Sequence, residues 1–173
     1  MPVPAAFLDR DGVINHRIPG DTYVTCPAEL EILPHVPEAI RTLRARGYRI
    51  VVFTNQRGVA RGFLSLEDLS EVHAKLEAEL SQAGAPIDAL YFCPHDNDDG
   101  CACRKPRPGM LLDAAREHDL DLARSVLVGD TPRDLEAGRA AGVGACFLIE
   151  SDSDLRQVLD RVPTVARGPR SLG

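Results

Sequence analysis

The chain has 173 residues, the size of one ordinary α/β domain with a sizeable hydrophobic core. Charged residues make up 27% and the formal net charge is −6, which argues against a general nucleic-acid-binding surface. The first residues lack the basic and apolar regions of a signal peptide, and no apolar run is long enough to span a bilayer. We therefore expect a cytoplasmic monomer without membrane or nucleic-acid partners.

The predicted elements alternate between strands and helices. Strands are expected at residues 3–8, 50–53, 87–92, 125–128 and 145–149, and helices at 36–46, 65–84, 108–118, 132–141 and, more weakly, 153–162. This alternation predicts a three-layer, Rossmann-like α/β fold with a mostly parallel sheet of about five strands. We expect a single domain at 1–162 and a flexible tail at 163–173.

The first predicted strand runs into two carboxylates, Asp9 and Asp11, one residue apart. Where strand pleating persists, residues i and i+2 point the same way, so these carboxylates can converge while Arg10 points elsewhere and does no chemistry. Carboxylates held that close repel each other unless a cation neutralises them. The pattern indicates a metal-dependent nucleophile with an acid/base partner, although a strand followed by a polar turn has the same residue types.

Two later strands also end in polar residues. Thr54 and Asn55 follow one of them, and Asp130 follows another directly after a glycine. Because the carboxyl ends of parallel strands meet at one edge of a sheet, Asp130 can complete an oxygen site for Mg²⁺ with Asp9. Asp134 is either a helix cap that supports the site or a direct metal ligand, and we favour the cap.

Cationic residues suited to phosphate follow the third predicted strand. Arg104 can bind phosphate through two N–H groups, and Lys105 can neutralise a carboxylate together with a transferring phosphoryl group. Arg61 lies between glycines that permit close approach to a substrate. A solvated basic run remains the alternative for Arg104 and Lys105.

Four soft or borderline metal ligands precede that basic run within eleven residues: Cys93, His95, Cys101 and Cys103. Such a complete N/S set is typical of a structural Zn²⁺ site, here a zinc loop at 93–103. The residues between the ligand pairs are too polar to be held by burial, so the metal would replace a core. Free thiols with a loop histidine are the alternative.

Taken together, these motifs resemble the haloacid dehalogenase superfamily of phosphohydrolases across nearly the whole chain. Phe7–Gly12 is similar to its nucleophile motif, Thr54 to its second motif, Lys105 to its third, and Gly129–Asp134 to its fourth. The Cys/His cluster before Arg104 narrows the resemblance to D-glycero-D-manno-heptose-1,7-bisphosphate 7-phosphatases and histidinol-phosphate phosphatases.

The resemblance implies the roles of individual residues. Asp9 attacks phosphorus and forms an aspartyl-phosphate, Asp11 acts as acid and then base, and Thr54 and Lys105 neutralise charge. Mg²⁺ is held by Asp9, the main-chain carbonyl of Asp11, and Asp130. The substrate-binding residues implied are Asn55, Gln56, Arg57, Arg61 and Arg104, with Arg104 on a second phosphate.

The same resemblance implies a capless phosphatase, because neither connection that could hold a cap domain is long enough for one. We expect the 7-phosphate of a heptose 1,7-bisphosphate to be removed. Histidinol phosphate or another small phosphorylated sugar is the alternative substrate. A zinc-stabilised binding module on an inactive phosphatase fold is the alternative outside the enzymes.

Overall fold

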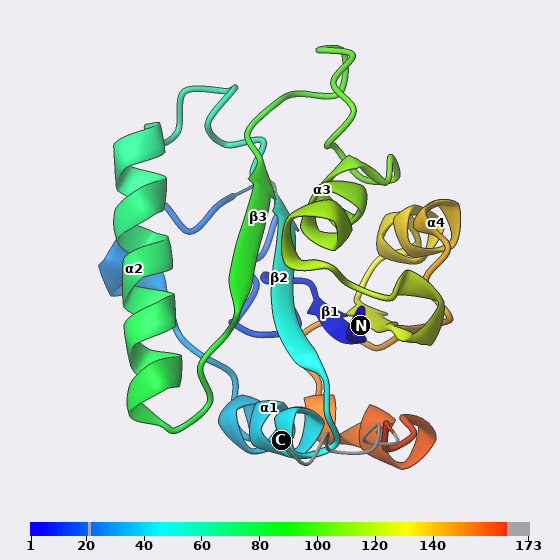
Figure 1. The fold of residues 1–173 in the computed structure, drawn as a ribbon. Helices are drawn as coiled ribbons and strands as arrows, with labels where there is room; N and C mark the ends of the chain where they lie inside the picture. The colour runs from blue at the N-terminus through cyan, green and yellow to red at the C-terminus, as the bar shows by residue number, and fades with distance from the viewer. Residues whose placement is uncertain (21, 166–173) are drawn as a thin grey trace.

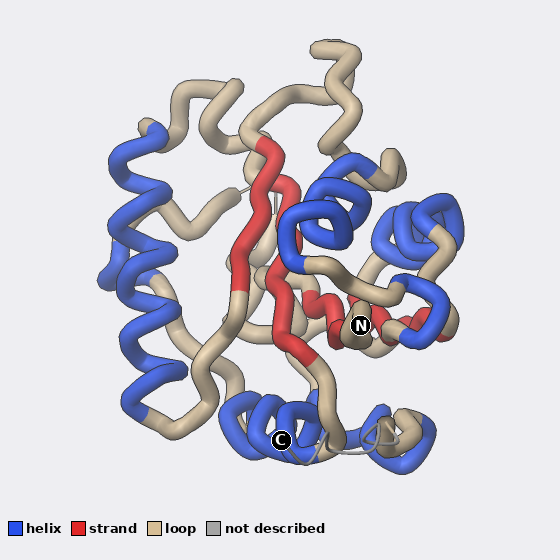
Figure 2. The backbone as a smooth tube through the Cα atoms, viewed as in Figure 1, coloured by secondary structure: helices blue, strands red, loops and turns tan. Residues whose placement is uncertain are grey.

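In the computed structural model, which describes residues 1–20 and 22–165, a parallel sheet of five strands forms the centre of the protein (Figures 1 and 2). The strand order is β3-β2-β1-β4-β5. The strands are β1 (Ala5–Leu8), β2 (Arg49–Asn55), β3 (Ala89–Cys93), β4 (Val126–Gly129) and β5 (Ala145–Leu148). Strand β1 pairs in parallel with β2 on one side and with β4 on the other. Successive strands are therefore added outward from β1 first on the β2 side and then on the β4 side, which makes β1 the point where the strand order reverses.

Helices cover both faces of the sheet, which confirms the three-layer α/β prediction. The helices are α1 (Val36–Ala45), α2 (Leu66–Gln82), α3 (Gly109–His118) and α4 (Pro132–Ala141). Ala6 and Leu8 of β1 pack in the core shared with α1 and α2, while Phe7 packs in the core shared with α3 and α4. Figure 1 shows α2 on the opposite side of the sheet from α3 and α4.

Helix α2 starts where the sequence predicts, at a capping box. The amide of Asp68 donates to Ser65 Oγ over 3.0 Å, and the amide of Ser65 donates to Asp68 Oδ2 over 2.8 Å. These bonds satisfy two amide groups that the first helical turn leaves without partners.

Several elements start or end one or two residues from the predicted bounds, and two differences are larger in kind. Strand β2 extends to Asn55, since Thr54 and Asn55 pair with Phe92 and Cys93 of β3. The weak final helix is a 3₁₀ helix, η3 (Leu155–Arg161). Short 3₁₀ helices also occur in the connections, as η1 (Pro27–Glu29) and η2 (Leu122–Arg124).

The end of the described chain is attached to the domain. Tyr48 Oη donates to the carbonyl of Pro163 over 3.1 Å, and the amide of Val165 donates to the carbonyl of Arg46 over 2.9 Å. The rest of the expected tail, 166–173, lies outside the described residues. Within residues 1–20 and 22–165, no helix is long and apolar enough to cross a membrane.

Candidate active site

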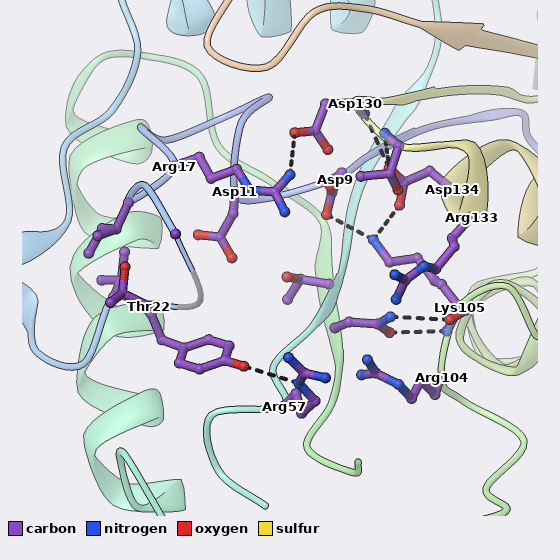
Figure 3. Close-up of a pocket in the computed structure, with 17 residues that line it drawn as sticks. Asp9, Asp11, Arg17, Thr22, Arg57, Arg104, Lys105, Asp130, Arg133 and Asp134 are labelled. Atoms are coloured by element: carbon purple, nitrogen blue, oxygen red, sulfur yellow. Dashed lines mark hydrogen bonds and ion pairs between the residues drawn. The ribbon is translucent and has the colours of Figure 1, made fainter. Parts of the chain in front are cut away.

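A pocket lies at the carboxyl ends of β1, β2 and β4, where the sequence predicts a site (Figure 3). Its charged lining residues are Asp9, Asp11, Arg17, Arg57, Arg104, Lys105, Asp130, Arg133 and Asp134. Parallel sheets bind ligands at this edge, near the point where the strand order reverses. The pocket therefore brings together residues that are separated by more than one hundred positions.

Lys105 neutralises two buried carboxylates at the base of the pocket. Its Nζ lies 2.9 Å from Asp9 Oδ1 and 2.6 Å from Asp134 Oδ1, as the dashed lines in Figure 3 show. Burial lowers the pKa of Lys105, but the two carboxylates outweigh it and raise this pKa above its ordinary value. Burial and repulsion from Asp134 raise the pKa of Asp9 despite Lys105. Asp9 thus needs further positive charge to stay ionised.

Asp134 combines the capping role favoured above with a second one. Its Oδ2 accepts from the amide and hydroxyl of Thr131, over 3.0 and 2.9 Å, at the start of α4. Its Oδ1 faces Lys105. The side chain therefore ties the helix start to the lysine that contacts Asp9.

The oxygen cluster of Asp9, Asp130 and Asp134 fits a divalent cation. One carboxylate oxygen of each lies within 4.8 Å of those of the others. The side chain of Asp130 is 1% exposed, and its Oδ1 has no hydrogen-bond partner among the described residues. Such an orphaned buried oxygen, in a set of hard oxygen ligands, fits Mg²⁺.

Gly12 makes room for this cluster. Its φ is +86°, and a Cβ at this position would clash with Asp130 Oδ2 and with Ser151 Oγ. Only glycine meets both requirements at low cost. Asp130 Oδ2 also pairs with Arg17 Nη1 at 3.1 Å, so a protein cation already faces this carboxylate.

Asp11 is held by an arginine to which the sequence pattern assigns no role. Arg10, whose exposure is 0%, donates from Nε (3.2 Å) and Nη2 (2.8 Å) to Asp11 Oδ1. Asn15 Nδ2 donates to the same oxygen, and Gln56 Nε2 donates to Oδ2. Burial raises the pKa of Asp11, but the Arg10 charge and these hydrogen bonds lower it overall. The expectation that Arg10 points away is wrong, because its long side chain folds back onto its neighbour.

Two of the expected substrate-binding residues, Asn55 and Gln56, contact protein groups, and Asn55 also lines the pocket. Gln56, 1% exposed, bridges Asp11 Oδ2 and Thr54 Oγ1 through Nε2, at 2.9 Å each, and is not among the residues that line the pocket. The side chain of Asn55 accepts from the backbone N–H of Lys105 through Oδ1 over 3.0 Å, and it donates to the carbonyl of Lys105 through Nδ2 over 3.3 Å. Both side chains thus orient residues that face the pocket.

The remaining cations form a second group in the pocket. Arg57 Nε donates to Tyr23 Oη over 3.1 Å, and Arg104 Nε donates to Asn97 Oδ1 over 2.9 Å. In Figure 3, Arg57 and Arg104 lie at the opposite end of the view from Asp130. Arg133 also lines the pocket.

Arg17 and Arg133 were not predicted from the sequence, although Arg133 stands only three residues after Asp130. Arg61 was expected to contact substrate. It lies with its guanidinium carbon 5.6 Å from the centroid of the Phe63 ring and is not among the lining residues.

The Cys/His cluster adopts a geometry suited to Zn²⁺. Cys93 Sγ lies 3.7 Å from Cys101 Sγ and 3.4 Å from His95 Nδ1, and His95 Nδ1 lies 3.3 Å from Cys103 Sγ. A tetrahedral ion with Zn–S bonds of about 2.3 Å places sulfur atoms about 3.8 Å apart. The donor set and its spacing thus fit a closed structural zinc site.

Comparison with known proteins identifies the family. The family model of haloacid dehalogenase-like hydrolases matches residues 4–142. A D-glycero-beta-D-manno-heptose-1,7-bisphosphate 7-phosphatase of Bordetella bronchiseptica is 47% identical over 136 residues, which are 79% of this chain and 75% of that protein. The D-glycero-alpha-D-manno-heptose-1,7-bisphosphate 7-phosphatase of Burkholderia mallei is 40% identical over 97% of this chain and 90% of its own length.

A solved structure supports the same assignment. The D,D-heptose 1,7-bisphosphate phosphatase of B. bronchiseptica, complexed with magnesium and phosphate, matches with a TM-score of 0.79 and 42% identity, covering 91% of this chain and 86% of that chain. Fold, family model and relatives agree with the resemblance drawn from the motifs. The chain belongs to the haloacid dehalogenase-like hydrolase family.

Proposed function

We propose that this protein is a Mg²⁺-dependent phosphatase that removes the 7-phosphate of D-glycero-D-manno-heptose 1,7-bisphosphate through an aspartyl-phosphate. Family membership and the activities of its relatives support a phosphatase. The pocket supports a doubly phosphorylated substrate, because Arg57, Arg104 and Arg133 line it in addition to the lysine that neutralises Asp9. Guanidinium groups favour a second phosphate and disfavour the cationic amine of histidinol phosphate.

Asp9 is the proposed nucleophile. Its Oδ1 accepts from the amide of Arg10 over 2.8 Å and from Lys105 Nζ over 2.9 Å, so we assign the attack on phosphorus to Oδ2. The Oδ2–P bond forms as the bond between phosphorus and the sugar oxygen breaks, and Asp11, which takes up a proton when the anionic substrate binds, gives that proton to the sugar oxygen. Asp11 then takes a proton from water, whose oxygen attacks phosphorus and releases phosphate and free Asp9.

The remaining roles concern charge. Mg²⁺, held by Asp9, the main-chain carbonyl of Asp11, and Asp130, would supply neutralisation of the transferring phosphoryl group. Lys105 and the hydroxyl of Thr54, which line the pocket, would bind the oxygens of the same phosphoryl group. Asp134 keeps the ammonium group of Lys105 beside Asp9.

Four further expectations belong to the same proposal. Residues 1–162 form one capless domain, Zn²⁺ stabilises the zinc loop at 93–103, and the protein acts as a monomer in the cytoplasm. The ligand spacing described above supports the zinc site.

Phosphate release tests the proposed function. The heptose 1,7-bisphosphate, the heptose 7-phosphate and histidinol phosphate are compared at equal concentrations, with Mg²⁺ and with EDTA. We expect Mg²⁺-dependent turnover that is highest for the bisphosphate and lost in Asp9→Asn. Highest turnover of histidinol phosphate would reassign the substrate, and absence of turnover for all phosphate esters would favour a binding module.

The arginine group can be tested separately. Arg133→Met should raise KM for the bisphosphate about tenfold or more, with little change for the 7-phosphate, because only the bisphosphate has a second phosphate. Arg107→Met is the matched control, since Arg107 is exposed like Arg133 and close in sequence to Lys105 but does not line the pocket. An equal change of KM for both substrates would contradict a role for Arg133 in binding the second phosphate.

A further inference from the structure

Two buried basic side chains, Arg10 and His73, lie behind the pocket and have no part in the mechanism above. Arg10 is the largest side chain with less than 2% exposure, and His73 of α2 is 7% exposed. Arg10 Nη1 lies 3.0 Å from His73 Nε2, across 63 residues of sequence. Burying a guanidinium group is costly in free energy unless its N–H groups find acceptors, and His73 can supply one for Arg10.

The chemistry of the two groups fixes the direction of their hydrogen bond. Arginine carries only donors, so His73 Nε2 must be the acceptor. His73 is then the neutral tautomer with its proton on Nδ1. Burial and the adjacent Arg10 charge lower the pKa of His73 to about 4, in agreement with a neutral ring near pH 7.

The contact also determines how Arg10 meets Asp11. With Nη1 bonded to His73, the guanidinium group turns Nε and Nη2 toward Asp11, and both reach the same oxygen, Oδ1. Asn15 adds a third donor to that oxygen over 2.9 Å. Oδ2 receives one hydrogen bond within the described residues, from Gln56. The carboxylate is thus anchored through one oxygen, and the other is left to exchange a proton.

We propose that His73 is a positioning residue that acts through Arg10 to hold Asp11 by Oδ1 and to present Oδ2 for proton transfer. This inference rests on the proposed function, because it gives Asp11 the acid/base role. His73 touches neither substrate nor metal ligand in this arrangement. Its contribution is to keep the Arg10 guanidinium group in the orientation that fixes Asp11.

Leaving-group dependence separates this role from simple packing. The sugar oxygen of the heptose needs a proton as it departs, whereas p-nitrophenolate leaves without one. The ratio kcat/KM reports only steps up to formation of the aspartyl-phosphate. In His73→Phe, which loses the acceptor and keeps an aromatic ring, kcat/KM for the heptose bisphosphate should fall about tenfold or more. The loss for p-nitrophenyl phosphate should be several-fold smaller.

His73→Gln is the rescue variant, because its Oε1 can accept from Arg10. It should recover most of the lost kcat/KM for the sugar. His73→Met serves as a second acceptor-free variant if the phenylalanine variant does not fold. Leu80→Ala is the matched control, since Leu80 is a buried residue of the same helix. It should lower Tm while changing both substrates equally.

Equal losses for both substrates in His73→Phe and His73→Met would show a merely structural role and overturn the inference. An unchanged kcat/KM for both substrates would overturn it as well. Failure of the proposed function is distinguishable from either outcome, because the parent protein would then turn over neither substrate, or Asp9→Asn would leave the turnover of both unchanged.

Discussion

The ammonium group of Lys105 lies 2.6 Å from Asp134 Oδ1, in an ion pair whose side chains are 5% and 0% exposed. The same ammonium group reaches Asp9 Oδ1. One cation therefore serves two buried carboxylates, and neither the proposed nucleophile, Asp9, nor the helix cap, Asp134, is independent of it.

Replacing Lys105 with methionine should impair both catalysis and stability. The variant leaves Asp9 and Asp134 without their shared cation, so we expect kcat to fall about 10²–10³-fold and the free energy of unfolding to fall by about 3–5 kcal/mol. Phosphate release and urea unfolding measure the two effects. Lys75→Met is the control, since Lys75 Nζ donates to the carbonyls of Pro27 and Leu30 and does not line the pocket. Full activity of the Lys105 variant would rule out its proposed role.

Gly12→Ala should weaken Mg²⁺ binding. A methyl group there collides with the Asp130 carboxylate, so the Mg²⁺ concentration for half-maximal activity should rise about tenfold or more. Gly62→Ala provides the comparison, because Gly62 also has a positive φ (+74°) but a Cβ there meets nothing within 4 Å. If both variants require the same Mg²⁺ concentration for half-maximal activity, the clash with Asp130 does not weaken Mg²⁺ binding.

The Cys/His cluster should contain stoichiometric zinc in the purified, untreated protein. Cys101→Ser should lower the zinc content and reduce Tm by about 4–8 °C, which corresponds to about 2 kcal/mol for a chain of this size. Elemental analysis and thermal unfolding provide the measurements. Cys26→Ser, outside the cluster, should change neither quantity. Well-folded protein without zinc would refute the assignment.

His73 should make stability fall as the solution becomes acidic. Its pKa is about 4 in the folded protein against an ordinary value of 6.5, so below about pH 6.5 the unfolded chain binds a proton that the native state does not. Between pH 7.5 and 5.0 this difference removes about 2 kcal/mol from the free energy of unfolding.

The His73→Gln variant isolates this effect. It lacks the titrating group, so its free energy of unfolding should fall by about 2 kcal/mol less than that of the parent over the same range. The exposed His118 gives the control variant His118→Gln, which should follow the parent protein. Urea unfolding at the two pH values measures both. Parallel pH dependence of parent and His73→Gln would contradict a depressed pKa of His73.

Much of the site could be predicted because it depends on topology. Once the strands are parallel, Asp9 and Asp130 must reach the same edge of the sheet, whatever their surroundings. The Cys/His cluster could be predicted for a different reason, because its ligand types and short separations leave few alternative structures.

The role of Arg10 could not be predicted in this way. The alternation of side chains applies only while the strand continues, and β1 ends at Leu8, before Asp9, Arg10 and Asp11. The orientation of the Arg10 guanidinium group then depends on an acceptor in α2, His73, which follows 63 residues later in the chain. Such a partner follows from packing and has no local signal.

The functions of Asn55 and Gln56 show the same limit. Their residue types correctly indicate hydrogen bonding at the end of β2, but an amide serves a phosphate or a neighbouring side chain equally well. Whether the Asn55 amide meets a phosphate or the backbone of Lys105 depends on where the segment around Lys105 lies, which the local sequence does not determine. Arg133 was missed because an arginine in the first turn of a helix is usually solvated.

The position of β1 has a consequence for the motions of the site. Because β1 pairs with β2 and β4, and the amide of Asp9 donates to the carbonyl of Val128, releasing the nucleophile locally would break hydrogen bonds on both sides at once. Segments held in this way open only at a free energy close to that of global unfolding. Amide hydrogens of β1 should accordingly be among the slowest to exchange with solvent, and the proposed nucleophile, Asp9, would be presented to substrate by the part of the molecule that opens least often.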